Sequence, residues 1–234
     1  MLLKFACLRV SLVFLLLPFL GHGAEQKSSR EQAQFAIYVG GKEVGQEKFL
    51  IQASGDSVSS SSTLSFRDPG KSRQTVKIET QLVMDERLVP RNYQLRTDVG
   101  GQKGIMKAVF AQGQANFEYL ANGSPAKSGL LVGDRFSVLD TNVFHHFAFI
   151  ARLFDFNSNE KTQSTEVVIP QELSNGILKI SNAGLEKTDI RGKKRELHHL
   201  KADSGTVLID LWIDDQHVLY KIALPVKGIE VVRN

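Results

Sequence analysis

Short runs of alternating hydrophobic and polar residues make up most of the chain from Phe35 onward. In the first run, Phe35, Ile37 and Val39 share one face, and the pair Gly40-Gly41 follows directly. Successive side chains of a strand point to opposite faces, and glycine pairs supply the positive φ angles of tight hairpin turns. The pattern therefore predicts antiparallel strands joined by short turns.

The same alternation recurs along the rest of the chain. Segments rich in glycine and in turn-forming polar residues separate the runs, for example Gly100-Gly101 and Asn122-Gly123. The last third alternates most clearly, and we expect strands there at about 185–191, 194–202, 206–213, 218–224 and 229–232. No repeat of fixed period occurs, which disfavours a propeller or a solenoid.

One expected strand is rich in serine. Ser59 to Ser62 are four consecutive serines, and Leu64 and Phe66 follow them. Small hydroxyl side chains bury little apolar surface, so we expect this strand to lie at an edge of the sheet or beside solvent.

A single segment departs from the alternation and shows helical spacing. We expect an amphipathic helix from about Asn142 to Phe154, because a polar triplet that can cap a helix start, Asp140-Thr141-Asn142, precedes apolar residues spaced three or four apart. This apolar stripe comprises Val143, Phe144, Phe147, Ile150, Ala151 and Phe154. Such a stripe can fill the concave side of a curved sheet.

Residues 1–24 have the pattern of an export signal. Lys4 and Arg9 precede an apolar run of about half the 20 residues that a spanning helix needs, and small residues follow it. We expect cleavage near Gly23 or Ala24, a periplasmic location and no spanning helix after cleavage. The polar residues 25–34 predict a flexible tether, and residues 35–234 predict a single all-β domain.

Composition narrows the function classes. Removing the leader also removes Cys7, the only cysteine, and leaves 210 residues with a net charge of about +2. Disulfides and thiolate ligands are then excluded, which favours a bacterial periplasmic protein over an animal extracellular one. A net charge close to zero also disfavours nucleic acid as a partner. The dense basic group at Arg191 to Arg195 is best explained as a solvated turn, with contact to an anionic membrane surface as the alternative.

Candidate catalytic and metal-binding residues are few. Adjacent histidines diverge on a helix or a strand, so neither His145-His146 nor His198-His199 can chelate a metal as a unit, and we expect no metal site. We place the first pair at the polar margin of the helix. Asp140 and Asp210 are the most constrained carboxylates, but no nucleophile elbow, phosphate loop or zinc-protease motif accompanies them. We therefore expect no catalytic residue and no cofactor.

Aromatic and aliphatic side chains are the best candidates for ligand contacts. They occur on the predicted helix and on two of the late strands. We expect an apolar ligand site lined by Phe144, Phe147, Ile150, Phe154, Trp212 and Tyr220.

Three segments occur in an order that resembles exported bacterial all-β families of unknown function. They are FAIYVGGKEVG from Phe35, LVPRNY from Leu88, and IDLWID from Ile209 followed by LYKI from Leu219. The resemblance implies a mostly β fold, a curved antiparallel meander or incomplete barrel with one helix. Such families are similar in shape to periplasmic lipoprotein carriers and other lipid-binding half-barrels, an analogy of fold that does not settle function.

The leading hypothesis is a non-enzymatic periplasmic envelope protein that binds a lipid-like apolar ligand between the sheet and the helix. One alternative is a structural or assembly module that engages an envelope protein through a sheet edge, with the serine-rich strand as the candidate edge. Another is a hydrolase or lyase that acts on envelope polymers through Asp140, Asp210 and the histidines.

Overall fold

A computed structural model describes residues 29–67, 74–121 and 123–234, so the predicted leader lies outside the described residues. Fifteen strands form one sheet, and the described part of the chain contains a single α-helix. The strands are β1 (Ser29–Val39), β2 (Lys42–Ser54), β3 (Ser57–Arg67), β4 (Thr75–Asp85), β5 (Pro90–Val99), β6 (Gln102–Ala111), β7 (Gln114–Ala121), β8 (Ser124–Leu131), β9 (Phe136–Val138), β10 (Thr162–Ile169), β11 (Ser174–Ile190), β12 (Lys193–Asp203), β13 (Leu208–Ile213), β14 (Leu219–Leu224) and β15 (Ile229–Arg233). The helices are the 3-10 turns η1 (Phe144–His146), η2 (Pro170–Glu172) and η3 (Pro225–Lys227), and α1 (Phe147–Leu153). Within these residues, no helix has the length and apolar character needed to cross a membrane.

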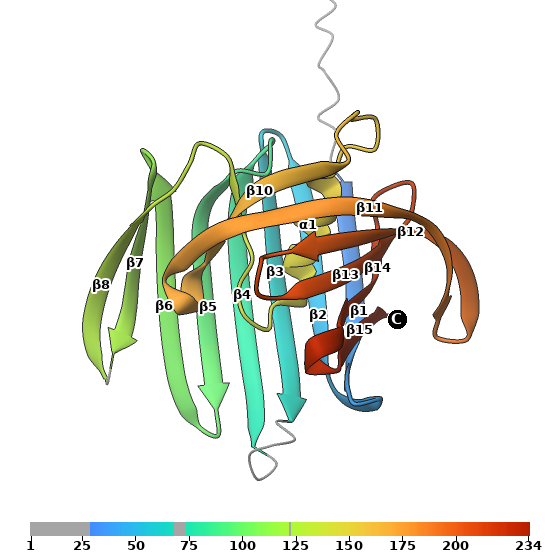
Figure 1. The fold of residues 1–234 in the computed structure, drawn as a ribbon. Coiled ribbons are helices and arrows are strands. Elements are labelled where there is room, and N and C mark those ends of the chain that lie inside the picture. Colours follow the sequence, from blue (N-terminus) through green and yellow to red (C-terminus); the bar gives the residue numbers. More distant parts are fainter. Residues whose placement is uncertain (1–28, 68–73, 122) are drawn as a thin grey trace, which may run out of the picture.

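The strand order is β8-β7-β6-β5-β4-β3-β2-β1-β15-β14-β13-β12-β11-β10-β9. The sheet has two arms, one formed by β1 to β8 and the other by β9 to β15, and neighbouring strands are antiparallel except for β9 and β10. The arms join where β1 pairs with β15. The short β9 is parallel to β10. The sheet bends back so that β10 to β14 cross in front of the wall formed by β1 to β8 (Figure 1). Its end strands, β8 and β9, are not neighbours in the sheet, which confirms the predicted curved and unclosed sheet with one helix.

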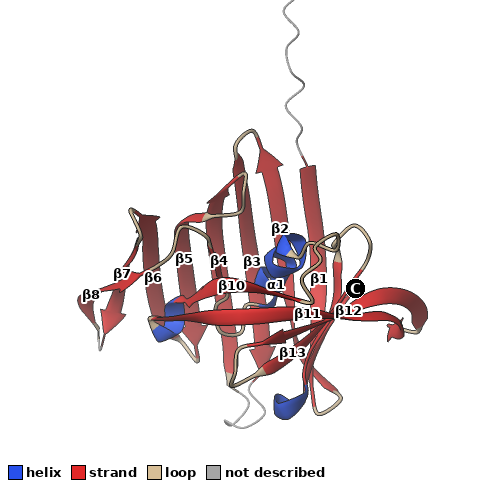
Figure 2. Cartoon of the chain, turned by 45° about the horizontal axis from the view of Figure 1, so that its top comes forward, coloured by secondary structure: helices blue, strands red, loops and turns tan. Residues whose placement is uncertain are grey.

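The main hydrophobic core lies between the two arms. The strand β4 shows how it arises, because Ile78, Leu82 and Met84 on one face are buried. Lys77 and Gln81, on the opposite face, are exposed. Residues from both arms and from α1 contribute to this core. Figure 2 shows α1 enclosed between the wall and the crossing strands. Burial of these side chains is the dominant stabilising contribution, in a chain whose one cysteine cannot form an internal disulfide.

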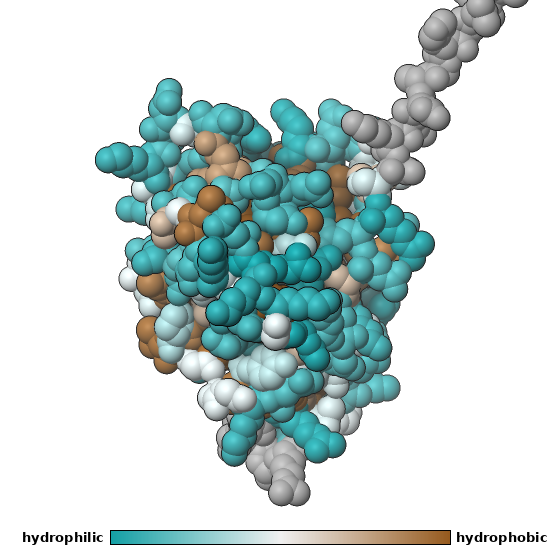
Figure 3. All heavy atoms as spheres, turned by 90° about the vertical axis from the view of Figure 1, so that its right-hand side faces the viewer, coloured by the Kyte–Doolittle hydropathy of each residue, from teal (hydrophilic) through white to brown (hydrophobic). Residues whose placement is uncertain are grey.

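A second, smaller core lies on the opposite face of the crossing strands. The tip of the β11–β12 hairpin brings Ile190 and Leu197 against Trp212, Ala223 and Val232. The side of the molecule where this hairpin projects carries mainly hydrophilic side chains at its surface (Figure 3). The hairpin therefore buries apolar residues that the last strands would otherwise expose.

The first strand begins earlier than predicted. Ser29 to Gln34, which we assigned to the flexible tether, pair with Lys48 to Ala53 in the β1–β2 ladder. Their hydrogen bonds to β2 compensate for a composition that has no hydrophobic alternation of its own. The strand expected at 185–191 likewise begins earlier, because β11 runs from Ser174 to Ile190.

The serine-rich strand was predicted at an edge or beside solvent, and the edge position is wrong. This strand, β3, pairs with β2 on one side and with β4 on the other. Ser60 and Ser62 face the interior, whereas Ser59 and Ser61 are half-buried on the outer face. The hydroxyl groups of the inner serines find polar partners inside the molecule, and this removes the penalty that led us to place the strand at an edge.

The helix is shorter than the predicted 142–154. It consists of η1 followed by the seven residues of α1, and neither start has a side-chain cap from the polar triplet. Asn142 instead adopts a left-handed backbone, with φ of 61°. A buried carboxylate from β2 takes the role that the sequence assigned to Asp140, Thr141 or Asn142.

Candidate functional site

A fully buried carboxylate on β2 holds the start of the helical segment. The Oε2 atom of Glu47 accepts hydrogen bonds from the backbone N–H groups of Phe144 and His145, both at 3.0 Å. Its Oε1 atom lies 2.7 Å from Nδ1 of His145. Glu47 and His145 are both 0% exposed. The first N–H groups of a helix lack partners within the helix, so this carboxylate satisfies them and ties η1 to the wall.

The chain of contacts continues to β3. The hydroxyl of Ser60 lies 3.3 Å from Nε2 of His145, on the other side of the ring from Glu47. Serine, histidine and carboxylate occur in the same order in the triads of serine hydrolases. A nucleophile must, however, be reached by its substrate, and Ser60 is only 5% exposed while its two partners are fully buried. The arrangement therefore acts as an anchor for the helix in this conformation.

A second buried network joins the wall to the segment before the helix. The hydroxyl of Tyr93 donates a 2.7 Å hydrogen bond to Oδ2 of Asp140. The Oδ1 atom of Asp140 accepts from the backbone N–H groups of Thr141 and Gln171 at 2.9 and 3.0 Å. The backbone N–H of Asp140 in turn donates to Nδ1 of His146 at 3.3 Å, and Nε2 of that ring has no hydrogen-bond partner among the described residues. Both histidines are thus interior residues, not residues at a polar margin as predicted.

Burial dominates the protonation of this second network. It raises the pKa of Tyr93 well above its usual value, and the adjacent Asp140 carboxylate raises it further. Burial also raises the pKa of Asp140, although the hydrogen bonds from Gln171, Tyr93 and Thr141 oppose this effect. Burial and then the neighbouring His145 hold the pKa of His146 well below its usual range. His146 is therefore neutral at pH 7.

A cavity of about 260 Å³ lies between the two arms, beside the end of α1. Its apolar lining comes from the β4–β5 turn, the start of β9, α1 and β11, and comprises Leu88, Val89, Phe136, Leu153 and Ile180. Arg87 and Arg135, both exposed, stand at its rim. The polar residues 163–166 of β10, which include the carboxylate Glu166, complete the lining. The cavity thus combines an apolar part with polar groups and two cationic groups.

The β4–β5 turn positions part of this cavity. Oδ1 of Asp85 accepts hydrogen bonds from the N–H groups of Arg87 and Val89 at 3.0 and 2.9 Å, and Oδ2 pairs with Arg91 at 2.9 Å. Leu88, between the two donors, has a left-handed φ of 62°. Burial opposes ionisation of Asp85, but these hydrogen bonds and Arg91 together lower its pKa. An ionised Asp85 therefore stabilises the turn that presents Arg87 and Leu88 to the cavity.

The structure brings together only some of the residues predicted to bind a ligand. Phe144, Phe147, Ile150 and Phe154 are all buried in the main core, at 6% exposure or less. Trp212 and Tyr220 belong to the second core, on the opposite face of the crossing strands. Whether any of the six contacts a ligand stays a prediction.

Trp212 lies in a polar and aromatic cluster of its own. The ring of His199 stacks on Trp212 with a centroid distance of 4.7 Å, and its two nitrogens pair with Asp210 at 2.8 Å and Glu186 at 3.0 Å. The ammonium of Lys221 lies 5.1 Å from the centre of the indole ring. Asp210 is therefore paired with a histidine and lies on the opposite face of the sheet from Asp140, so these two carboxylates do not form a catalytic pair.

Reasoning from the sequence missed Glu47 and Tyr93 as site residues. The position of Glu47 in β2 could have identified it, because it lies on the same face of the strand as Phe49 and Ile51, which are buried. A charged residue at such a position must find a buried partner. In the described part of the chain, no group of three or more histidine, cysteine or acidic side chains is arranged to hold a metal ion.

No protein-family model matches the sequence, and no curated protein matches it. Among solved structures, the fold is similar to the crystal structure of a beta-barrel-like protein of the domain of unknown function DUF1849 from Brucella abortus. The TM-score is 0.58 at 10% sequence identity, over 88% of this chain and 94% of that chain. At this identity the likeness shows the fold alone. The chain thus has the fold of a beta-barrel-like protein of unknown function, as the predicted resemblance implied.

Proposed function

We propose that this protein is a non-enzymatic binding protein of the bacterial envelope, exported by its leader, and that it takes the apolar end of a lipid-like ligand beside α1. The observation that carries the proposal is the cavity between the arms. Five hydrophobic residues form one part of its lining, the polar residues 163–166 of β10 form another, and the exposed Arg87 and Arg135 lie beside them. An amphiphile with an anionic head matches this arrangement, because its chain would displace water from the walls and its head would pair with arginine.

The size of the cavity limits the ligand. Its volume of about 260 Å³ lies just below the usual 300–1,000 Å³ of small-molecule sites. Phe147 and Ile150 fill the adjoining interior as part of the packed core. The proposal therefore concerns a short acyl chain, or one end of a longer chain, and not a large lipid enclosed in the barrel.

Binding of dodecanoate to the leaderless protein, measured by calorimetry, tests the proposal. Leu153 is half-buried at the cavity wall, so Leu153→Trp fills the cavity without disturbing a fully buried position. We expect Leu153→Trp to bind dodecanoate at least tenfold more weakly. The unmodified protein should bind dodecanoate more tightly than dodecanol, and Arg135→Glu should lose this preference. Val226→Trp and Lys227→Glu, on the exposed η3, are the matched controls. Absence of binding by the unmodified protein, or unchanged binding by Leu153→Trp, would refute the proposal.

The sheet edge favours a second candidate function, the docking of an envelope protein. β8 is the end strand of the sheet, and Leu131 on it is 75% exposed. Pro125 and Lys127 lie in the first half of β8, and such residues protect edge strands against open-ended pairing. The carbonyl oxygen of Leu131 already accepts a hydrogen bond from the side chain of Asn175 at 3.0 Å, so residues 128–130 are left for a partner strand. A photo-crosslinker at Leu131 should then give a defined adduct in the native periplasm, whereas one at Val109, 52% exposed on β6, should not.

A further inference from the structure

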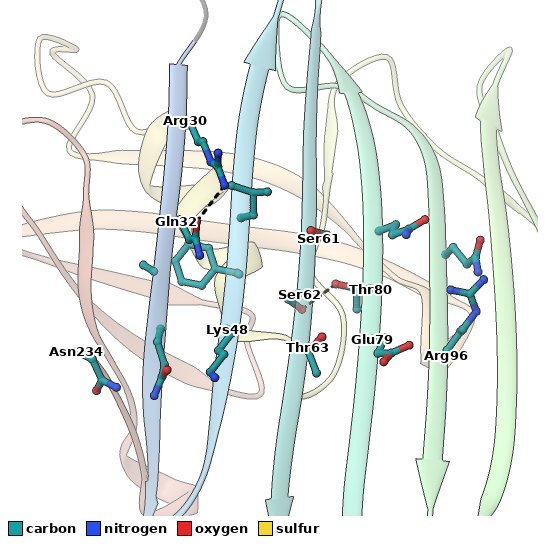
Figure 4. A pocket seen from close by; sticks show the side chains of 16 residues that line it. Arg30, Gln32, Lys48, Ser61, Ser62, Thr63, Glu79, Thr80, Arg96 and Asn234 are labelled. Atoms are coloured by element: carbon teal, nitrogen blue, oxygen red, sulfur yellow. Dashed lines mark hydrogen bonds between the residues drawn. The ribbon is translucent and has the colours of Figure 1, made fainter.

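A hollow of about 900 Å³ lies on the outer face of β1 to β5, the face turned away from α1. Figure 4 shows the side chains around it, with Arg30 and Gln32 on β1, Lys48 on β2 and Arg96 on β5. It shares no lining residue with the cavity beside α1. The hollow is therefore a separate feature of the wall.

The serine-rich strand explains why the outer face is hollow there. The outward side chains of β3 include Ser61 and Thr63, which are short, whereas the neighbouring strands present longer side chains. Pairing in register places Lys48 beside Thr63, Thr63 beside Glu79, and Glu79 beside Arg96. A trough with a floor of hydroxyl groups consequently runs along β3, between the long side chains of β2 and those of β4 and β5 (Figure 4).

The charge of the lining is positive. Arg30, Lys48 and Arg96 contribute three cationic side chains, and Glu79 is the only carboxylate side chain in the lining. Glu79 is already paired with Lys77 at 2.6 Å, and this hydrogen bond and charge lower its pKa. Among the described residues, neither Arg30 nor Lys48 has a carboxylate within ion-pair distance. The trough thus combines unpaired cations with hydroxyl and amide groups.

We propose that this trough binds an anionic polysaccharide, a chain of sugar units that carry carboxylates. The hydroxyl groups of Ser61 and Thr63 and the amides of Gln32, Gln81 and Gln94 can exchange hydrogen bonds with sugar hydroxyls. The cations pair with the carboxylates. Lys48 on β2 and Arg96 on β5 lie three strands apart. At about 4.8 Å per strand this is roughly 15 Å, the span of a short oligosaccharide.

A single-stranded nucleic acid fits the lining less well. Sequence-tolerant binding of single strands relies on exposed aromatic side chains on which the bases stack. Phe49 is the one aromatic residue of the lining, and it is 3% exposed, with its ring stacked on His145 inside the molecule. Charge alone would attract either polymer, so the hydroxyl and amide floor is what selects the sugar chain.

The test is binding of polygalacturonate to the leaderless protein, followed by calorimetry, with dextran and an oligothymidylate as comparison ligands. We expect binding of polygalacturonate that weakens with salt, little binding of dextran, and weaker binding of the oligothymidylate. Lys48→Glu combined with Arg96→Glu should weaken polygalacturonate binding at least tenfold. Thr63→Trp, which fills the exposed floor without changing charge, should weaken it as well.

The control variant is Lys193→Glu combined with Lys194→Glu, which makes the same change in net charge at an exposed hairpin tip. It should retain the affinity of the unmodified protein. Equal losses in the control and the trough variants would overturn the proposal, as would equal binding of dextran or of the oligothymidylate. Failure of dodecanoate binding would leave it standing, because the two sites share no residue.

Discussion

Glu47 and His145 form a fully buried pair, 2.7 Å apart, that links β2 to the start of the helical segment 98 residues later. The same carboxylate accepts two backbone N–H groups of η1. Three donors thus depend on one side chain that has no access to solvent. Removing one member of a buried pair leaves the other without compensation, which is the most costly way to alter it.

Glu47→Gln should therefore lower the free energy of unfolding by about 3 kcal/mol. The amide retains one acceptor oxygen but presents an N–H₂ group where a donor already points. Urea denaturation followed by circular dichroism measures the loss. Glu43→Gln, at an exposed position of the same strand, is the control and should change stability by less than about 0.5 kcal/mol. Equal effects of the two substitutions would contradict the anchoring role.

Stability should fall on mild acidification because of His146. Its pKa is well below the usual 6.5 in the folded protein, so below pH 6.5 the unfolded chain binds a proton that the folded chain does not. The free energy of unfolding then decreases by up to about 1.4 kcal/mol per pH unit from this group. The raised pKa of Asp140 acts with the opposite sign, since its proton binds more tightly to the folded chain.

Comparing the unmodified protein with His146→Phe isolates the contribution of the histidine. Denaturation curves between pH 7 and pH 5 should show a smaller pH slope for the variant, whatever its stability at pH 7. The remaining titratable groups are present in both proteins, so the difference between the two slopes reports on His146. Identical slopes would show that His146 titrates normally in the folded state.

Gly45 on β2 is required by close packing of backbone, not by a special φ angle. A Cβ atom there would lie 2.6 Å from Cα of Phe66 and closer still to its Cβ and to the carbonyl oxygen of Ser65. Gly45→Ala must therefore displace β3, and we expect a loss of about 2–3 kcal/mol. Gly176→Ala on β11, where nothing lies within 4 Å of the added atom, should be neutral or slightly stabilising. Thermal unfolding of the two variants makes the comparison.

The single tryptophan reports on the β11–β12 hairpin. Leu197 is 2% exposed and packs in the second core with Trp212. Leu197→Ala should cost about 2–4 kcal/mol and shift the fluorescence of Trp212 to longer wavelength as water enters the cluster. Leu185→Ala on the same hairpin, at a side chain 61% exposed, should leave both stability and emission unchanged. An unshifted spectrum in Leu197→Ala would mean that the hairpin does not shield the indole.

Much of the architecture follows from local pattern. The alternation in segments such as Val76 to Met84 predicts strands with one buried face, and the glycine pairs predict their hairpins, because both depend on neighbouring residues alone. The phenylalanine stripe after Asp140 predicts a buried helix on the same grounds. The predicted helix start was wrong because its cap comes from Glu47, far away in sequence.

Other features depend on which strands become neighbours. Ser59 to Ser62 predicted a strand at an edge or beside solvent, yet β3 is paired on both sides, and its inner hydroxyls have partners on η1 and β4. The six candidate ligand residues separate between two cores because Trp212 lies on the face of the crossing strands opposite Leu211 and Ile213. Pattern alone assigns a residue to one face of its strand but does not say what covers that face.

The sequence by itself determined the periodicity of the strands and the place of the helix, since these depend on neighbouring residues. Only the tertiary structure decided that Glu47 meets His145, that Tyr93 meets Asp140, and that hydroxyl groups form the floor of an outer trough. Such pairings depend on strand order and on how the sheet bends back on itself. Strand order and bending are set by the free energy of the whole packed chain, and no single segment determines them.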